Sequence, residues 1–149
     1  EQEGFKIINN LTWQKTNPPP NLACRCFTHS TETILWARKN DKKSRHFFNY
    51  QKMKEMNGGK QMKDVWTGAL TKPSEKTEGK HPTQKPEYSL EKIVLASTEE
   101  GQVILDPFCG SGTTGVEAVR FGRKFIGIDV SEEYLEISKR RLEKVANDK

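Results

Sequence analysis

The stretch Val103-Ile-Leu-Asp-Pro-Phe-Cys-Gly-Ser-Gly-Thr-Thr-Gly115 decides the fold of this chain. Three apolar residues, two of them β-branched, predict a buried strand that ends at Asp106. Gly110 and Gly112 predict a turn, and an apolar periodic run from Thr113 onward predicts a helix. A strand, a glycine turn and a helix in this order form the start of an α/β unit, whose ligand site lies at the carboxyl ends of the strands.

The residues that follow continue this pattern. Lys124 to Asp129 predicts a second strand that also ends on a carboxylate. Ser131 to Val145 predicts a helix with Ser131 as its N-cap. We therefore expect half of a doubly wound α/β sheet, with a ligand close to Asp106 and Asp129.

The two carboxylates restrict the choice of ligand. Gly110-Ser-Gly-Thr-Thr-Gly115 also fits the dinucleotide pattern G-x-G-x-x-G, which is a weak signal alone. A dinucleotide would place its pyrophosphate on the turn and the helix N-terminus, where Asp106 would repel it. A ligand with a cationic end and no phosphate fits better. S-adenosylmethionine (SAM) carries an ammonium, a sulfonium and a ribose. Asp129 is placed to accept hydrogen bonds from both ribose hydroxyls.

Two motifs resemble those of the SAM-dependent DNA amino-methyltransferases. Asp106-Pro-Phe-Cys-Gly-Ser-Gly-Thr-Thr114 resembles their motif I, and His81-Pro-Thr-Gln-Lys-Pro86 resembles their motif X. Motif X before motif I is the order of the permuted β-class, and the chain is similar to the later part of β-class adenine methyltransferases of the DpnA and MboII type. The resemblance implies a Rossmann-like SAM-methyltransferase fold with a mixed sheet, incomplete in this chain, and an irregular basic insert.

The resemblance also implies which residues bind the cofactor. Thr83, Gln84 and Lys85 would face the methionine end of SAM, and Lys85 would pair with its carboxylate. His81 is expected to make structural hydrogen bonds rather than to act as a base. The expected cofactor-binding residues are His81, Thr83, Gln84, Lys85, Asp106, Pro107, Phe108, Gly110, Ser111, Gly112, Thr113, Asp129 and Val130.

The catalytic motif of the family has no match in the sequence. It consists of Asp, Asn or Ser followed by Pro-Pro and an aromatic residue. Asn17-Pro-Pro-Pro20 comes nearest, but Pro20 has no ring face to stack on a flipped base, so we interpret this segment as a loop. In the permuted order the motif would precede Glu1. We therefore expect no catalytic residue in this chain, and we expect the chain to be a portion of a longer enzyme that alone transfers no methyl group.

The positive charge is concentrated in one segment. The net charge is +5, and residues 38–80 hold twelve Lys or Arg against five Asp or Glu. Next to the methyltransferase motifs, this excess favours a surface facing DNA phosphates over a solvated loop. The expected DNA-binding residues are Lys42, Lys43, Arg45, Lys60 and Lys63.

The resemblance divides the chain into three parts: residues 1–38 as sheet strands following the catalytic motif, 39–80 as the target-recognition region, and 81–149 as the SAM-binding half. β-Forming residues predict a strand within Phe5–Trp13 and an antiparallel one at Thr31–Arg38. Helices are expected at 51–56 and 88–96, whereas 71–80 lacks periodicity.

The cysteines favour a cytoplasmic protein. No paired pattern is seen among the three cysteines, Cys24, Cys26 and Cys109. The sequence also contains no apolar run long enough to predict a membrane partner. Cys24 and Cys26 with His29 would supply only three zinc ligands at a poor spacing, so we expect no metal.

The expected function is site-specific methylation of adenine N6 in DNA, within a restriction-modification system. DNA is the expected partner, together with a missing N-terminal half or a second copy of the chain. Methylation of cytosine N4 instead of adenine N6 remains an alternative, because the motif that distinguishes the two reactions is not in the sequence. A catalytically incomplete SAM- and DNA-binding subunit, a methyltransferase of RNA or protein, and a nicotinamide enzyme also remain as alternatives.

Overall fold

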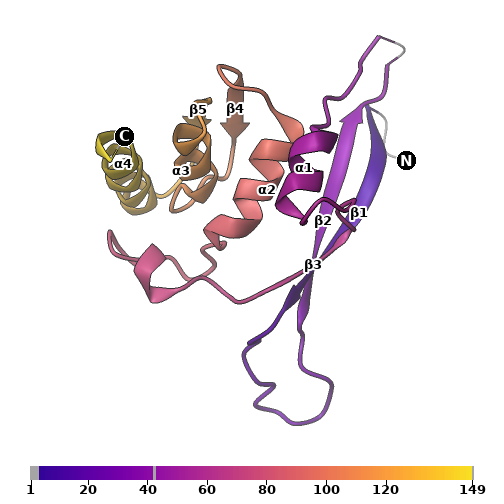
Figure 1. The fold of residues 1–149 in the computed structure, drawn as a ribbon. Coiled ribbons are helices and arrows are strands. Elements are labelled where there is room, and N and C mark those ends of the chain that lie inside the picture. The colour runs from indigo at the N-terminus through magenta and orange to yellow at the C-terminus, as the bar shows by residue number, and fades with distance from the viewer. Residues whose placement is uncertain (1–3, 42, 149) are drawn as a thin grey trace.

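The computed structural model describes residues 4–41 and 43–148, which form two partial sheets and four α-helices (Figure 1). In the first sheet, β2 runs antiparallel to β1, and β3 pairs in parallel with the other edge of β1. The second sheet is a parallel pair. The strands are β1 (Phe5–Lys15), β2 (Thr31–Lys39), β3 (Val65–Gly68), β4 (Val103–Asp106) and β5 (Lys124–Gly127).

The helices connect the two sheets. α2 packs against α1 on one side and α3 on the other, and α3 packs against α4. None of the helices in the described part of the chain combines the length and apolar character needed to cross a bilayer. The helices are α1 (Tyr50–Met56), α2 (Glu87–Ser97), α3 (Thr113–Arg120) and α4 (Glu132–Asn147), with a short 3-10 helix, η1 (Pro73–Glu75).

The unit from β4 to α4 confirms the predicted succession of strand, glycine turn, helix, strand and helix. Ser131 is the N-cap of α4, and its hydroxyl accepts a hydrogen bond from the Tyr134 amide at 3.3 Å. β5 ends at Gly127, two residues earlier than predicted, so Asp129 lies in the loop beyond the strand. The fold is α/β with incomplete sheets, as predicted.

The first sheet contains the predicted antiparallel hairpin and one strand that was not predicted. β3 pairs in parallel with Thr12–Lys15 at the end of β1. Its four residues have no periodic pattern of their own, because the pairing is set by a partner more than fifty residues earlier in the chain. η1 also lies in the 71–80 segment, which was expected to lack regular structure.

The main hydrophobic cluster lies between the first sheet and the helices. Its buried members are Met53, Leu95 and Ala96, and Trp36 packs against them as a partly buried ring. Trp13 of β1 is also buried, at 3% exposed. The cluster fixes α2 against the hairpin and so fixes motif X, which leads into α2.

The β4–β5 pair has one covered face and one open face. Ile104 and Phe125 are partly buried, and the Phe125 ring packs beside Gly115 of α3. The alternate residues Leu105 and Ile126 are 59% and 53% exposed. Parallel strands are normally covered on both faces, so among the described residues this sheet lacks one of its two layers.

Candidate functional site

The turn after β4 depends on two glycines. Gly110 and Gly112 have φ of 49° and 75°, a region that L-residues with side chains rarely adopt. A Cβ at Gly110 would lie 2.9 Å from His81 Nε2, and one at Gly112 would lie 2.0 Å from Ser138 Oγ. The missing side chains therefore let the turn approach motif X on one side and α4 on the other.

Asp129 braces this turn. Its Oδ2 accepts a hydrogen bond from the Gly110 amide at 2.8 Å, and its Oδ1 accepts one from the Ser131 amide at 2.9 Å. These two hydrogen bonds lower the pKa of Asp129 and keep it ionised, and the one from Ser131 has the larger effect. The sequence predicted this carboxylate as a ligand group. The structure adds a bracing role that the sequence did not indicate.

Asp106 is held in a similar way at the end of β4. Its Oδ1 accepts from the Phe108 amide at 3.1 Å, and its Oδ2 accepts from the Thr114 hydroxyl at 2.7 Å. The carboxylate therefore has a fixed orientation at the first turn of α3. Its charge disfavours an anion at this helix N-terminus.

Motif X and motif I line one cavity of about 200 Å³, called here the cofactor cavity. Pro107, Gly112 and Val130 of the predicted set do not line it, and Phe108 is 87% exposed at its rim. Leu90, Cys109 and Thr114 line it without having been predicted. The predicted residues that the structure brings together are His81, Thr83, Gln84, Lys85, Asp106, Phe108, Gly110, Ser111, Thr113 and Asp129.

Gln84 supplies a free acceptor in the cavity wall. It is 8% exposed, and its Nε2 donates to the Glu75 carbonyl at 2.7 Å. Its Oε1 has no hydrogen-bond partner among the described residues. A buried acceptor without a partner is costly, and this one belongs to a residue that lines the cavity.

His81 packs against α4, and its expected role as a structural hydrogen-bonding residue remains a prediction. Its ring lies 4.2 Å from that of Tyr134, edge to face, and its Nδ1 accepts from the Thr83 amide at 3.3 Å. Burial lowers the pKa of His81, although the charge of Asp129 acts in the opposite direction. The neutral imidazole thus helps to fix the motif X backbone.

A second cavity of about 290 Å³ adjoins the first and shares Thr83, Gln84 and Lys85 with it. Glu32, at its edge, bridges two lysines: its carboxylate lies 2.9 Å from Lys15 Nζ and 2.7 Å from Lys85 Nζ. Burial acts to raise the pKa of Glu32, but the hydrogen bonds from the two lysines lower it overall. Lys85, predicted to pair with the cofactor carboxylate, is thus already paired with a residue that the sequence did not indicate.

Arg141 of α4 is a further residue that the sequence analysis missed. Its side chain is buried, and Nη1 donates to the Ser111 carbonyl at 2.8 Å and to Thr113 Oγ1 at 3.0 Å. Nη2 pairs with Glu87 Oε1 at 3.0 Å. One guanidinium therefore ties the glycine turn to the start of α2.

The predicted DNA-binding residues lie elsewhere. Lys43, Arg45, Lys60 and Lys63 are exposed, and none of them lines the cofactor cavity. Lys42 lies outside the described residues. Their assignment to DNA remains a prediction.

The chain resembles known proteins along nearly its whole length. Residues 1–140 match the family described as DNA methylase. The Type II methyltransferase M2.LlaDCHI of Lactococcus lactis subsp. cremoris is 77% identical over 146 residues, which are 98% of this chain and 54% of that protein. The Type II methyltransferase M2.DpnII of Streptococcus pneumoniae is 76% identical over 143 residues, or 96% and 53% of the two proteins. The chain thus spans about half the length of the curated relatives it matches.

Solved structures show the same architecture. The crystal structure of the M1.HpyAVI–SAM complex superposes with a TM-score of 0.71 at 34% identity, over 93% of this chain and 63% of that one. The PvuII DNA methyltransferase, which is cytosine-N4-specific, superposes with a TM-score of 0.72 at 19% identity, over 93% and 54%, and supports the fold alone. These likenesses confirm the predicted methyltransferase-type α/β fold. The chain belongs to the DNA methylase family.

Proposed function

We propose that this chain binds SAM in the cofactor cavity and contributes the cofactor-binding part of a DNA amino-methyltransferase. The observation that carries the proposal is the convergence of motif X and motif I on one cavity with two fixed carboxylates, Asp106 and Asp129. Both carboxylates favour a cationic ligand over a phosphate. The partnerless Gln84 Oε1 in the cavity wall fits the ammonium group of SAM.

The second cavity is the proposed position of the methyl acceptor. It shares Thr83, Gln84 and Lys85 with the cofactor cavity, so ligands in the two cavities would meet across motif X. When bound, SAM supplies an electrophilic methyl group and a thioether leaving group. The contribution of the protein is then to hold an amine in line with the methyl group, because proximity and orientation supply much of the rate enhancement.

The proposed acceptor is the N6 amine of adenine in DNA, in an enzyme of the restriction-modification type. The resemblance of motifs X and I to the β-class adenine methyltransferases supports this choice, as do the Type II methyltransferases M2.LlaDCHI and M2.DpnII among the relatives. The acceptor is tested by nucleoside mass spectrometry of methylated DNA. N6-methyladenine is expected, and N4-methylcytosine would contradict the adenine assignment.

We propose further that a second polypeptide segment completes the enzyme. Two observations support this: the open apolar face of β4–β5, and the absence of an Asp-Pro-Pro-aromatic motif from the 149 residues. The three parts predicted from the sequence, 1–38, 39–80 and 81–149, would then join one catalytic domain. Asn17-Pro-Pro-Pro20 remains a loop in this proposal, since it connects β1 to β2.

Radiolabelled methyl transfer to duplex DNA tests this proposal. The 149-residue chain alone is expected to give no turnover. Addition of the remaining part of the M2.LlaDCHI protein is expected to restore it, because that relative is 77% identical over the shared region. Robust turnover by the chain alone would contradict the proposal. So would a lack of turnover in the mixture while the intact relative is active under the same conditions.

A further inference from the structure

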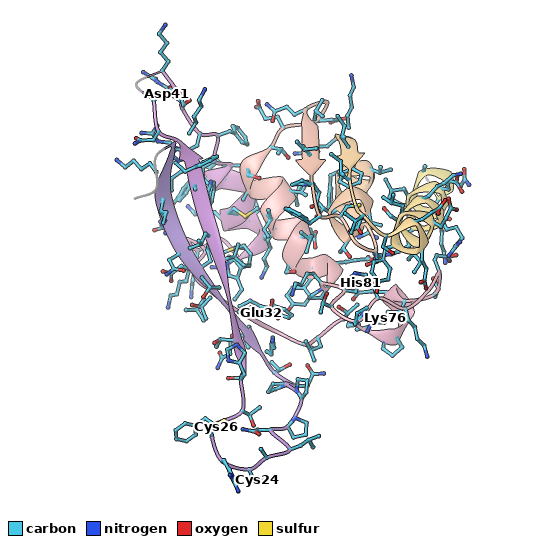
Figure 2. The ribbon with its side chains drawn as sticks, turned by 180° about the vertical axis from the view of Figure 1, so that it is seen from behind. Cys24, Cys26, Glu32, Asp41, Lys76 and His81 are labelled. Carbon is cyan, nitrogen blue, oxygen red and sulfur yellow. The ribbon has the colours of Figure 1, made fainter. Side chains whose placement is uncertain are left out.

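The loop of residues 16–30 projects from the molecule at the end of the β1–β2 hairpin (Figures 1 and 2). Its base is closed by the Lys15 amide, which donates to the Ser30 carbonyl at 2.7 Å. It is also anchored to the segment after β3, because the Leu70 amide donates to Asn17 Oδ1 at 2.8 Å. The loop therefore leaves the body of the protein at a defined place.

The tip of this loop has an ordered turn and an unusual surface. Asn21 fixes the turn, since its Oδ1 accepts from the Ala23 amide at 3.0 Å and its Nδ2 donates to the Cys26 carbonyl at 3.1 Å. Phe27 is 100% exposed and Leu22 is 90% exposed. Large apolar side chains held in water on an ordered turn indicate a contact surface.

The charge of the loop indicates an anionic partner. Residues 16–30 contain Arg25 and no Asp or Glu. On the same edge of the molecule, Lys76 lines the second cavity, and Figure 2 shows it near His81. No ion pair is found for Arg25 or Lys76 among the described residues. Arg25 lies two residues from the exposed Phe27, and an unpaired cation close to an aromatic ring is a combination that binds nucleic acid, through phosphates and base faces.

The position of the loop relative to the two cavities selects DNA as the partner. Pro19 of the loop lines the second cavity together with Lys15 and Thr83, so the loop rises from the rim of the proposed acceptor site. We propose that residues 16–30 form a DNA-contact surface, in which Arg25 pairs with a phosphate and Phe27 stacks on a base beside the target. This inference rests on the proposed function.

Lys43 and Arg45, two of the basic residues predicted from the sequence, lie at the opposite end of the hairpin. Asp41, which opens the turn containing Lys43 and Arg45, and Cys24 mark the two ends in Figure 2, with Glu32 between them. β2 alone separates the Asp41 turn from Thr31 by roughly 26 Å, at about 3.3 Å per residue. Lys139 of α4 is exposed like Arg25, has no ion pair among the described residues and is not one of the expected DNA-binding residues, so it provides a control for charge.

Fluorescence anisotropy with a labelled duplex and saturating SAM tests the surface on the 149-residue chain. Arg25→Gln and Phe27→Ala are each expected to weaken binding ~5-fold or more, since base stacking and phosphate contacts have this magnitude. Arg25→Gln should also reduce the salt slope by about one, whereas Phe27→Trp should retain affinity. Lys139→Gln should leave affinity and salt slope unchanged. Weakening by Arg45→Gln with no effect of Arg25→Gln and Phe27→Ala would overturn the inference.

Thiol reactivity provides a second measurement that needs no variant. Cys24 and Cys26 are exposed in the loop, and Cys109 is buried. Duplex DNA is expected to slow maleimide labelling of the loop cysteines severalfold, with buried Cys109 as the internal reference. Unchanged labelling at saturating DNA would overturn the inference, as would a preference for duplex RNA or a lack of DNA binding by a chain that still binds SAM. A chain that binds no SAM would instead contradict the proposed function.

Discussion

Asp106 and Asp129 show how single residues determine the ligand of a glycine turn. Each carboxylate accepts two hydrogen bonds within the turn, and so presents a fixed negative charge to the cofactor cavity. The sequence was sufficient to predict their presence at this edge, because Asp106 and Asp129 each end a predicted strand. The hydrogen bonds by which they brace the turn depend on its geometry, which the sequence pattern did not reveal. The Glu32–Lys85 ion pair was not predicted either, because its two residues are 53 positions apart in the chain.

Asp106→Asn is the substitution that most directly separates a cationic from a phosphate ligand. It keeps an acceptor for the Phe108 amide but removes the charge. SAM affinity is expected to fall about tenfold, in line with the strength of hydrogen bonds to charged groups. Calorimetric titration of SAM measures this, with thermal unfolding as the control for folding. Unchanged SAM affinity, or a gain in affinity for NAD, would contradict the assignment.

Glu117 makes stability depend on pH. It is fully buried in α3, one oxygen accepts from Arg120, and the other has no partner in the described part of the chain. Burial raises its pKa from 4.5 to about 7. The folded chain thus keeps a proton that the unfolded chain releases between these pH values. The free energy of unfolding should therefore fall as pH rises from 4.5 to 7. Above pH 7 the loss of stability from ionising the buried Glu117 carboxyl is fully present.

Glu117→Gln removes this ionisation while keeping the shape and one acceptor. The variant is expected to be more stable than the wild type by about 1–3 kcal/mol at pH 8, with little difference at pH 4.5. Urea unfolding at several pH values measures the difference. A difference between the two proteins that stays constant from pH 4.5 to 8 would show that the buried carboxyl does not titrate in this range.

At the scale of elements, the sequence predicted the features that residues close together in the chain determine. The glycine turn, the Ser131 cap and the amphipathic helices each follow from residues close together in sequence. β3 did not, because it is a strand only through its parallel pairing with β1. The turn between β4 and α3 is the element whose shape matters most for the cofactor.

Gly112→Ala and Gly101→Ala form a matched pair that tests this turn. Both glycines have left-handed φ, 75° and 81°, but a Cβ at Gly101 would meet nothing within 4 Å. Gly101→Ala should cost only the backbone strain, about 1–2 kcal/mol of stability. Gly112→Ala should cost about 2–5 kcal/mol, because its Cβ would collide with Ser138, and it should weaken SAM binding. Equal losses of stability and SAM affinity in the two variants would contradict the close packing of the turn on α4.

At the scale of the whole molecule, the open face of β4–β5 indicates that another layer packs there. Leu105→Asn with Ile126→Asn should leave SAM binding by the chain intact, because both side chains are more than half exposed. The double substitution should abolish methyl transfer when the variant chain is mixed with the remaining part of the M2.LlaDCHI protein. Leu135→Asn, on the exposed side of α4, is the control and should retain turnover. Full turnover with the double variant would exclude this face as the contact.

Calorimetric titration of the wild-type chain with SAM and with NAD, under identical conditions, tests the identity of the cofactor most directly. The fixed carboxylates at the ends of β4 and β5 predict one SAM bound per chain and no heat of binding with NAD. Binding of NAD without binding of SAM would contradict the assignment of the cofactor cavity, and with it the proposed methyl transfer.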